Sequence, residues 1–377
     1  MARSMALKMA AGNRAKLFPA KSHGSIAAVV PEDTDGICKS MVEKHNYVCE
    51  EHTFAENPSW EVRRVPRNRP PVLLQHGLLM DGITWLLLPP EQSLAFLLAD
   101  NGYDVWLANT RERNIAAYWD WSWDELVAYD LPATYKYVHV QTGQKLHYVG
   151  HSLGTLIALA SFSKSQVLNM LRSAALLAQL LILYTGGILE FDPRGYLCNS
   201  AFLPFLYHLS SAWESVIKFL KDICKRTGID CTNLLTSFTG QNCCLNSSIV
   251  DVFLDHEPQS SSTKNMMHLS QMIREGTITM FNYNNKDENR KHYGQPTPPV
   301  YKMTNIPKHL PLFLSNGGAD ALSDVNDVQL LLDSLKDHDG DKLVIQYRAD
   351  YAHADYVMGE NAKQDVYEPL IAFFKLQ

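Results

Sequence analysis

The chain has 377 residues, of which 46% are apolar, and a formal net charge of −6. This length and composition suit one large α/β domain with a sizeable insertion, or two domains. The negative balance gives no support to nucleic acid as a partner, and the sequence contains neither a Cys-x-x-Cys nor a His-Glu-x-x-His pattern that would suggest a metal site.

The first 35 residues are predicted to form a disordered or targeting extension. Residues 1–31 contain five basic and no acidic residues, and they lack the continuous apolar stretch of a secretory signal peptide. The most apolar window, residues 174–189, is interrupted by Gln179 and by two glycines, and it is shorter than the ~20 residues that span a bilayer. The sequence therefore predicts no transmembrane segment.

Short apolar runs alternate with helical patterns along most of the chain. Strands are expected at residues 72–75, 103–108, 146–149, 174–178, 310–314 and 343–347, and helices at 92–100, 122–140, 155–160 and 366–375. Ser122 and Glu125 fit a capping box at the start of the second helix, whose apolar side is expected to carry Leu126, Tyr129 and Tyr137. This alternation predicts an α/β fold, with a mainly parallel sheet and helices on both faces. This alternation of strands and helices is absent over residues 181–295. We predict that these residues form a helical cap or lid, inserted into a core of residues 36–180 and 296–377.

The stretch Gly150-His151-Ser152-Leu153-Gly154 lies between an expected strand and an expected helix. It fits Gly-x-Ser-x-Gly, the nucleophile elbow of α/β-hydrolases, where a sharp turn leaves the serine strained and exposed at the top of the sheet. Glycines are needed at positions 150 and 154 because side chains there would collide with the strand and the helix. We interpret Ser152 as a nucleophile; the alternative is a chance match in a chain with 20 glycines.

A neutral serine needs a base within hydrogen-bond reach, and the base needs a carboxylate that fixes its tautomer. In α/β-hydrolases the chain order is serine, acid, histidine. Asp320 and His353 satisfy this order, and each lies in a loop after an expected strand. Asp324 is the weaker candidate for the acid because it is expected to cap the next helix. His151 adjoins the serine but is expected to point away, and Asp355 is expected only to shape the histidine loop.

Two backbone N–H groups are candidates for an oxyanion hole. One is that of Leu78, in the turn His76-Gly77-Leu78 after the strand at residues 72–75. The other is that of Leu153, directly after the serine. The predicted chemistry, ester hydrolysis through an acyl-enzyme, requires no metal and no organic cofactor.

With these residues the chain resembles the acid lipase family of gastric and lysosomal lipases, most of all its plant triacylglycerol lipase members. The resemblance is carried by NYVCEEH (46–52), PPVLLQHGLL (70–79), SLAFLLADNGYDVWLANTR (93–111), WSWDELVAYDLPA (121–133), YVGHSLGT (148–155), LPLFLSNGGADALSDV (310–325) and DYAHADYV (350–357). It implies an α/β-hydrolase with a helical lid that hydrolyses triacylglycerols or related lipid esters at a lipid–water interface. It also implies Ser152 as nucleophile, Asp320 as acid and His353 as base, with Leu78 and Leu153 as oxyanion donors.

Members of this family usually enter the secretory pathway, which implies an extracellular, vacuolar or lysosome-like location. The lack of a convincing signal peptide leaves an organelle or the cytoplasm as alternatives. The chain also departs from the family pattern near residues 53–59, 111–118 and 180–189, where segments are shortened. These departures keep two alternative functions open: a catalytically impaired hydrolase that binds lipid, and a general short-chain esterase.

Overall fold

The computed structural model describes residues 3–11, 36–55, 69–109, 120–181, 232–259 and 261–377. Eight strands form one sheet in the order β2-β1-β4-β3-β5-β6-β7-β8. They are β1 Arg3–Ala11, β2 Tyr47–Ala55, β3 Pro71–Gln75, β4 Asp104–Asn109, β5 Leu146–Ser152, β6 Leu171–Gln179, β7 Leu312–Gly317 and β8 Leu343–Arg348. β1 pairs antiparallel with β2 and β4, and the other pairings are parallel. The predicted mainly parallel α/β fold is confirmed.

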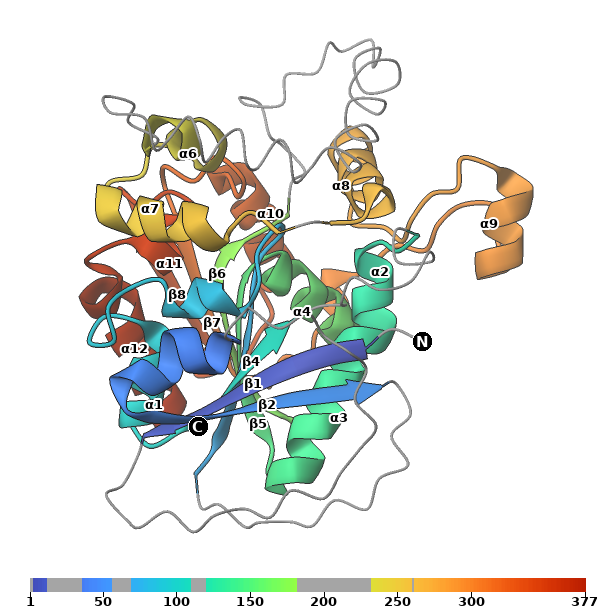
Figure 1. Cartoon of the computed structure of the whole chain (residues 1–377). Helices are drawn as coiled ribbons and strands as arrows, with labels where there is room; N and C mark the ends of the chain where they lie inside the picture. Colours follow the sequence, from blue (N-terminus) through green and yellow to red (C-terminus); the bar gives the residue numbers. More distant parts are fainter. Residues whose placement is uncertain (1–2, 12–35, 56–68, 110–119, 182–231, 260) are drawn as a thin grey trace.

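Helices lie on both sides of this sheet (Figure 1). They are α1 Leu94–Asp100, α2 Trp123–Glu125, α3 Leu131–Thr142, α4 Leu153–Ser163, α6 Thr232–Thr239, α7 Ser247–His256, α8 Thr263–Glu275, α9 Lys286–Tyr293, α10 Val325–Ser334, α11 Asp355–Met358 and α12 Glu368–Lys375. The predicted capping box is present, because Ser122 N donates to Glu125 Oε2 (2.7 Å) and Ser122 Oγ accepts the Asp124 N–H (3.3 Å). Among the described residues, no helix is long and apolar enough to cross a bilayer.

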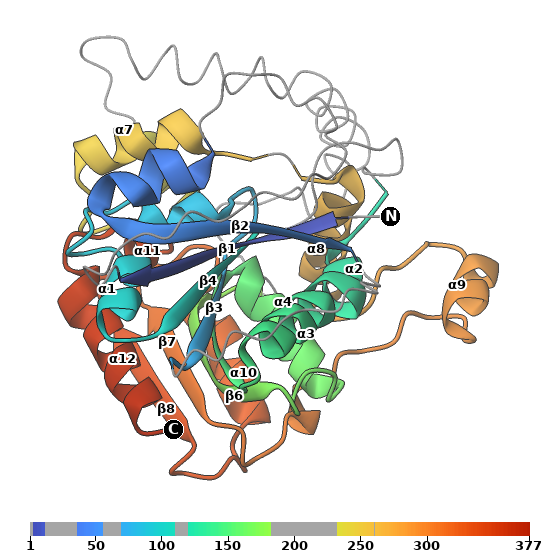
Figure 2. The same ribbon diagram turned by 60° about the horizontal axis from the view of Figure 1, so that its bottom comes forward.

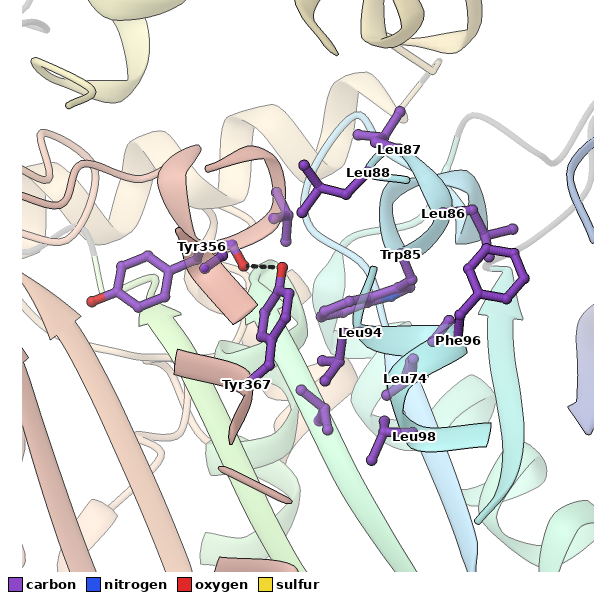
Figure 3. Close-up of a cluster of buried hydrophobic side chains, with 14 of the residues drawn as sticks. Leu74, Trp85, Leu86, Leu87, Leu88, Leu94, Phe96, Leu98, Tyr356 and Tyr367 are labelled. Carbon is purple, nitrogen blue, oxygen red and sulfur yellow. Dashed lines mark hydrogen bonds between the residues drawn. The ribbon is translucent and has the colours of Figure 1, made fainter. Parts of the chain in front are cut away.

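Two buried clusters hold the helices to the two faces of the sheet. Successive residues of β3 point to opposite faces, so Val72 and Leu74 belong to the cluster that includes α1, α7, α11 and α12, whereas Leu73 belongs to the cluster of α3, α4 and α10. Figure 3 shows part of the first cluster, where Trp85, Leu94 and Tyr367 lie together. Burial of each such side chain is worth about 1.5–3 kcal/mol relative to exposure, which fixes the helices against the strands.

Part of the predicted N-terminal extension belongs to the sheet. β1 forms main-chain pairs on both of its edges, and Figure 2 shows it between β2 and β4. Residues 12–35 of that extension and 182–231 of the predicted cap lie outside the described residues, as do most of the predicted departures from the family pattern. The division into core, extension and cap therefore stays a prediction.

The structure corrects one expectation about the helix after the capping box. Leu126 is buried, as expected for its apolar side, but Tyr129 is 53% exposed. The reason is a π-helical turn at Leu126–Asp130 between α2 and α3. This turn winds more widely than an α-helix, so it shifts the side chains away from the predicted face.

A buried carboxylate ties α2 to the chain that follows α8. Asp124 accepts hydrogen bonds from Phe281 N–H at Oδ2 (2.7 Å) and from the Tyr301 hydroxyl at Oδ1 (2.6 Å). Burial raises the pKa of Asp124 to about 6. The charged form of this carboxyl group therefore depends on its two donors near neutral pH, and the two hydrogen bonds contribute most where the carboxyl group is ionised.

We expect the substitution Tyr301→Phe to lower the free energy of unfolding by about 1–3 kcal/mol at pH 7.5, because it leaves a buried carboxylate oxygen without its donor. The loss should be smaller at pH 5, where Asp124 is protonated in the folded protein. Urea unfolding at the two pH values measures the difference. The control is Tyr367→Phe, which removes another buried hydroxyl, the donor to Tyr356 O (2.8 Å), and should cost the same at both. Equal losses for Tyr301→Phe at both pH values would contradict the expectation.

Candidate active site

The predicted nucleophile sits on a strained turn between β5 and α4. Ser152 ends β5 and caps α4 with φ 54° and ψ −120°, a conformation that non-glycine residues adopt only when the surrounding structure imposes it. Its side chain is buried, with the residue 4% exposed. The predicted sequence of strand, sharp turn and helix is therefore present at this serine.

Three glycines allow the segments around Ser152 to approach closely. A Cβ on Gly150 would lie 2.8 Å from Gly154 C, and one on Gly154 would lie 2.6 Å from Gln75 O. A Cβ on Gly77 would lie 2.9 Å from Ser152 Cβ and 3.3 Å from its Oγ. The end of β3 and the turn after it are thus packed directly against the serine.

The two candidate oxyanion donors lie at this junction. Leu78 follows Gly77, which touches the serine. Leu153 is the first residue of α4, where an N–H has no acceptor within its own helix and the helix dipole favours negative charge. The assignment of both N–H groups to an oxyanion hole stays a prediction.

Asp320 and His353 lie in the loops after β7 and β8 and form a buried pair. His353 Nδ1 is 2.9 Å from Asp320 Oδ2 and 3.0 Å from Oδ1. Asp320 Oδ1 also accepts the N–H groups of Leu322 and Ser323, each at 2.9 Å. The ionised carboxylate is therefore well satisfied, and it directs the Nδ1 proton of His353 toward itself. Nε2 of His353 is buried and accepts no hydrogen bond from the described residues, so it is the nitrogen that can take a proton.

Asp324, the alternative candidate for the catalytic acid, caps a helix as expected. Asp324 caps α10, and its Oδ1 accepts the N–H groups of Asn326 (2.7 Å) and Asp327 (3.1 Å). The carboxyl group is thus engaged by the first turn of its own helix, whereas the carboxyl group of Asp320 contacts the histidine.

His151 has a contact that the sequence did not predict. The ring does not point away from the site: its Nε2 is 3.1 Å from the carbonyl oxygen of His353, and the two ring centroids are 4.9 Å apart. Burial lowers the pKa of His151 to about 3, so the ring is neutral and donates its Nε2 proton to this carbonyl. The residue before the serine thereby links the elbow to the histidine loop.

Residues 239–244, within the predicted cap, hold the histidine loop through several hydrogen bonds. His353 N–H donates to Thr239 O (3.0 Å). Asp355 accepts three N–H groups, from Ala352 at 2.7 Å, Cys243 at 3.2 Å and Cys244 at 3.1 Å. The expectation that Asp355 shapes this loop is confirmed, but neither the partners from the cap segment nor the contact with Thr239 had a signal in the sequence.

Two disulfides are present in the described part of the chain, Cys38–Cys49 and Cys243–Cys244. The second lies beside Asp355, and potential ligand atoms of these three residues fall within 4.8 Å of one another. Because the sulfurs are bonded to each other and the carboxylate already accepts three N–H groups, this cluster does not fit a metal ion.

A strained serine at a strand-to-helix turn, followed along the chain by an aspartate and a histidine in loops after parallel strands, defines the α/β-hydrolase class. No family model matches the sequence. The chain is 44% identical to triacylglycerol lipase 2 of Arabidopsis thaliana, over 94% of this chain and 91% of the relative. It is 36% identical to triacylglycerol lipase 1 of the same plant, over 90% and 91%, and 33% identical to human gastric triacylglycerol lipase, over 91% of each.

The chain therefore belongs to the acid lipase family, and it is an ester hydrolase of the lipase type. Among solved structures, it is similar to the monoacylglycerol lipase of Paleococcus ferrophilus, with a TM-score of 0.47 and 15% identity, over 83% of this chain and all of that one. A likeness at this level carries no argument about function.

We expect Gly154→Ala to lower kcat for ester hydrolysis by about tenfold to a hundredfold, because the new Cβ would displace the serine from the end of β3. The free energy of unfolding should fall by about 1–3 kcal/mol, as in other overpacked sites. Ester hydrolysis and urea unfolding measure the two effects. Gly340→Ala is the matched control, since nothing lies within 4 Å of a Cβ there, and it should behave as wild type. Unchanged turnover in Gly154→Ala would contradict the tight packing at the elbow.

Proposed function

We propose that the protein hydrolyses triacylglycerols or closely related lipid esters, with Ser152, His353 and Asp320 as its catalytic triad. The observation that carries the proposal is the buried hydrogen bond between His353 and Asp320 (2.9 Å). It is supported by the strained backbone of Ser152, with φ 54° at the turn between β5 and α4. The choice of substrate rests on the relatives that are named triacylglycerol lipases.

The proposed reaction follows from the chemistry of these groups. His353 Nε2 takes the proton of Ser152 as its oxygen attacks the ester carbonyl, and Asp320 stabilises the imidazolium that forms. The N–H groups of Leu78 and Leu153 bind the negative oxygen of the tetrahedral intermediate, and each such donor is worth about 2.7–4 kcal/mol in the transition state. His353 then protonates the departing alcohol, and water hydrolyses the acyl-enzyme by the same steps.

We also propose that the protein works in a compartment of the secretory pathway or outside the cell. Two disulfides, Cys38–Cys49 and Cys243–Cys244, support this location, because disulfides form and persist in oxidising compartments. The lipid–water interface is the proposed place of action, since triacylglycerols are insoluble in water.

The first test compares the purified chain with Ser152→Ala on emulsified triolein and on the soluble ester p-nitrophenyl butyrate. Loss of the nucleophile should reduce kcat by about 10⁴-fold or more on both substrates. Fatty acid release from triolein is expected to exceed hydrolysis of the soluble ester. The reverse preference would favour a short-chain esterase, and equal background rates in both proteins would favour a lipid-binding protein without activity.

A second test uses the two aspartates of the loop after β7. Asp320→Asn should lower kcat by about 10³–10⁴-fold, because His353 loses the carboxylate that orients its ring and stabilises its charge. Asp324→Asn makes the same chemical change four residues away and should keep activity within about twofold, since asparagine caps a helix as well as aspartate does. Comparable losses in both variants would show that the acid is not Asp320.

A further inference from the structure

The loop that carries Leu78 is tied to the segment after α7. We define the oxyanion loop as residues 76–81, between β3 and the 3-10 turn Gly82–Leu86. Asp81 N–H donates to Glu257 Oε1 (2.9 Å), and Gln259 N–H donates to Leu79 O (2.7 Å). These two hydrogen bonds join parts of the chain that are far apart in the sequence, so the position of the loop depends on them.

The oxyanion loop has a strained backbone at the residue that accepts one of these two hydrogen bonds. Leu79 has φ 59°, in the left-handed region that a leucine adopts only when its surroundings impose it. Its carbonyl oxygen accepts the bond from Gln259. Downstream, Trp85, Leu86 and their neighbours are buried in the core (Figure 3). The far end of the loop is therefore fixed by packing. Residues 78–81 combine the partial packing of Leu78 and Met80 on the core clusters with the contacts to Glu257 and Gln259.

Two carboxyl groups lie side by side where the oxyanion loop meets the segment after α7, and one of them lacks a donor. Glu257 is completely buried, its Oε1 accepts the Asp81 N–H, and its Oε2 accepts no hydrogen bond from the described residues. The carboxyl group of Asp81 lies against that of Glu257, while its Oδ1 accepts Ile83 N–H (2.7 Å). Glu257 is fully buried and Asp81 is partly buried, and two adjacent carboxyl groups in such a place cannot both be ionised without a large cost.

The other titratable groups that face this pair are His76, at the end of β3, and His256, the last residue of α7. Burial lowers the pKa of His76, so its ring is neutral around neutral pH and does not offset the charge of the two acids. A proton shared between the two carboxyl groups would satisfy Glu257 Oε2, which accepts no hydrogen bond from the described residues.

We propose that Asp81 and Glu257 share one proton, and that this proton keeps the oxyanion loop in place against Ser152 under acidic conditions and releases it as the pH rises. The proposal rests on the proposed function, because it assigns Leu78 N–H to the oxyanion hole. Asp81 and Glu257 are positioning residues: they act on the reaction through the backbone of the loop and do not touch the substrate.

The direction of the pH effect follows from the burial of the pair. Burial raises the pKa of Glu257 well above its usual range and also raises that of Asp81. A carboxyl group whose pKa is raised in the folded state contributes its stabilisation fully below the unfolded pKa, and the contribution is lost as the pH rises through the raised value. The loop is thus held in acid and loosened toward alkaline pH. Catalysis by serine and histidine alone would show the opposite pH dependence. Its activity would rise with pH, because the histidine must be unprotonated to act as the base.

The activity test measures kcat/KM for p-nitrophenyl butyrate between pH 4 and 9 in the wild type and in Glu257→Gln. The wild type should lose activity on the alkaline side by about 10²–10³-fold, the effect of one oxyanion donor. Glutamine keeps an oxygen that accepts Asp81 N–H and adds an N–H₂ donor to the Asp81 carboxylate. Glu257→Gln should therefore keep the activity in acid and retain at least tenfold more of it at pH 8. Asp81→Asn should act in the same way.

Glu275→Gln makes the same change at an exposed residue outside this loop and should leave the profile unchanged. A purely structural role of Glu257 would lower kcat/KM at every pH without moving the alkaline limb. That result, or a wild type without an alkaline loss, would overturn the proposal.

A second measurement needs neither ester hydrolysis nor a variant. Hydrogen exchange of wild-type peptides over residues 77–82, corrected for the intrinsic rate, should show protection that falls at least tenfold from pH 5 to pH 8. Peptides from β5 should show no such change. Constant protection of the loop would refute the shared proton even if Ser152→Ala abolishes hydrolysis. Conversely, pH-dependent protection in a protein without ester hydrolysis would leave the pair intact and refute only the proposed function.

Discussion

The close approach of three backbone segments at Ser152 is the constraint on which the site depends. Gly77, Gly150 and Gly154 stand where a Cβ would come within 3 Å of a neighbouring segment. Because no side chains separate them, the end of β3, the end of β5 and the start of α4 meet at one point. The positive φ of Ser152 is imposed by this packing. This packing keeps the Ser152 hydroxyl in a fixed place relative to the N–H groups that we propose as oxyanion donors, and such preorganised donors need no rearrangement when charge develops.

The segment from Thr239 to Gln259 connects the two halves of the site. Its first part binds the histidine loop, through Thr239 O and through the N–H groups of Cys243 and Cys244 on Asp355. Its last part binds the oxyanion loop through Glu257 and Gln259. Between them, α7 buries Ile249, Val250 and Leu254 in the core. One stretch of chain within the predicted cap thus positions elements that lie more than 200 residues apart.

Local patterns explain what the sequence could predict. Alternating apolar runs revealed the parallel strands, Gly-x-Ser-x-Gly revealed the elbow, and chain order singled out Asp320 and His353, which the structure pairs. The contacts of His151 with His353 and of Glu257 with Asp81 had no such signal, because they join residues about 200 and 176 positions apart. Tyr129 was misplaced because a π-helical turn changes the period, and periodicity arguments assume a regular helix.

Three buried carboxyl groups surround the site, and they differ in how many donors satisfy them. Asp320 accepts two backbone N–H groups and the His353 ring, and Asp355 accepts three backbone N–H groups. The oxygens of both carboxyl groups thus have several donors within the protein. Glu257 has one backbone donor and a second carboxyl group beside it, and its Oε2 accepts no hydrogen bond from the described residues, so a proton shared with Asp81 would complete its hydrogen bonding. Glu257 also fixes the oxyanion loop. The well-satisfied carboxyl group of Asp320 thus lies beside the histidine, whereas the carboxyl group that depends on a proton lies where the loop is held.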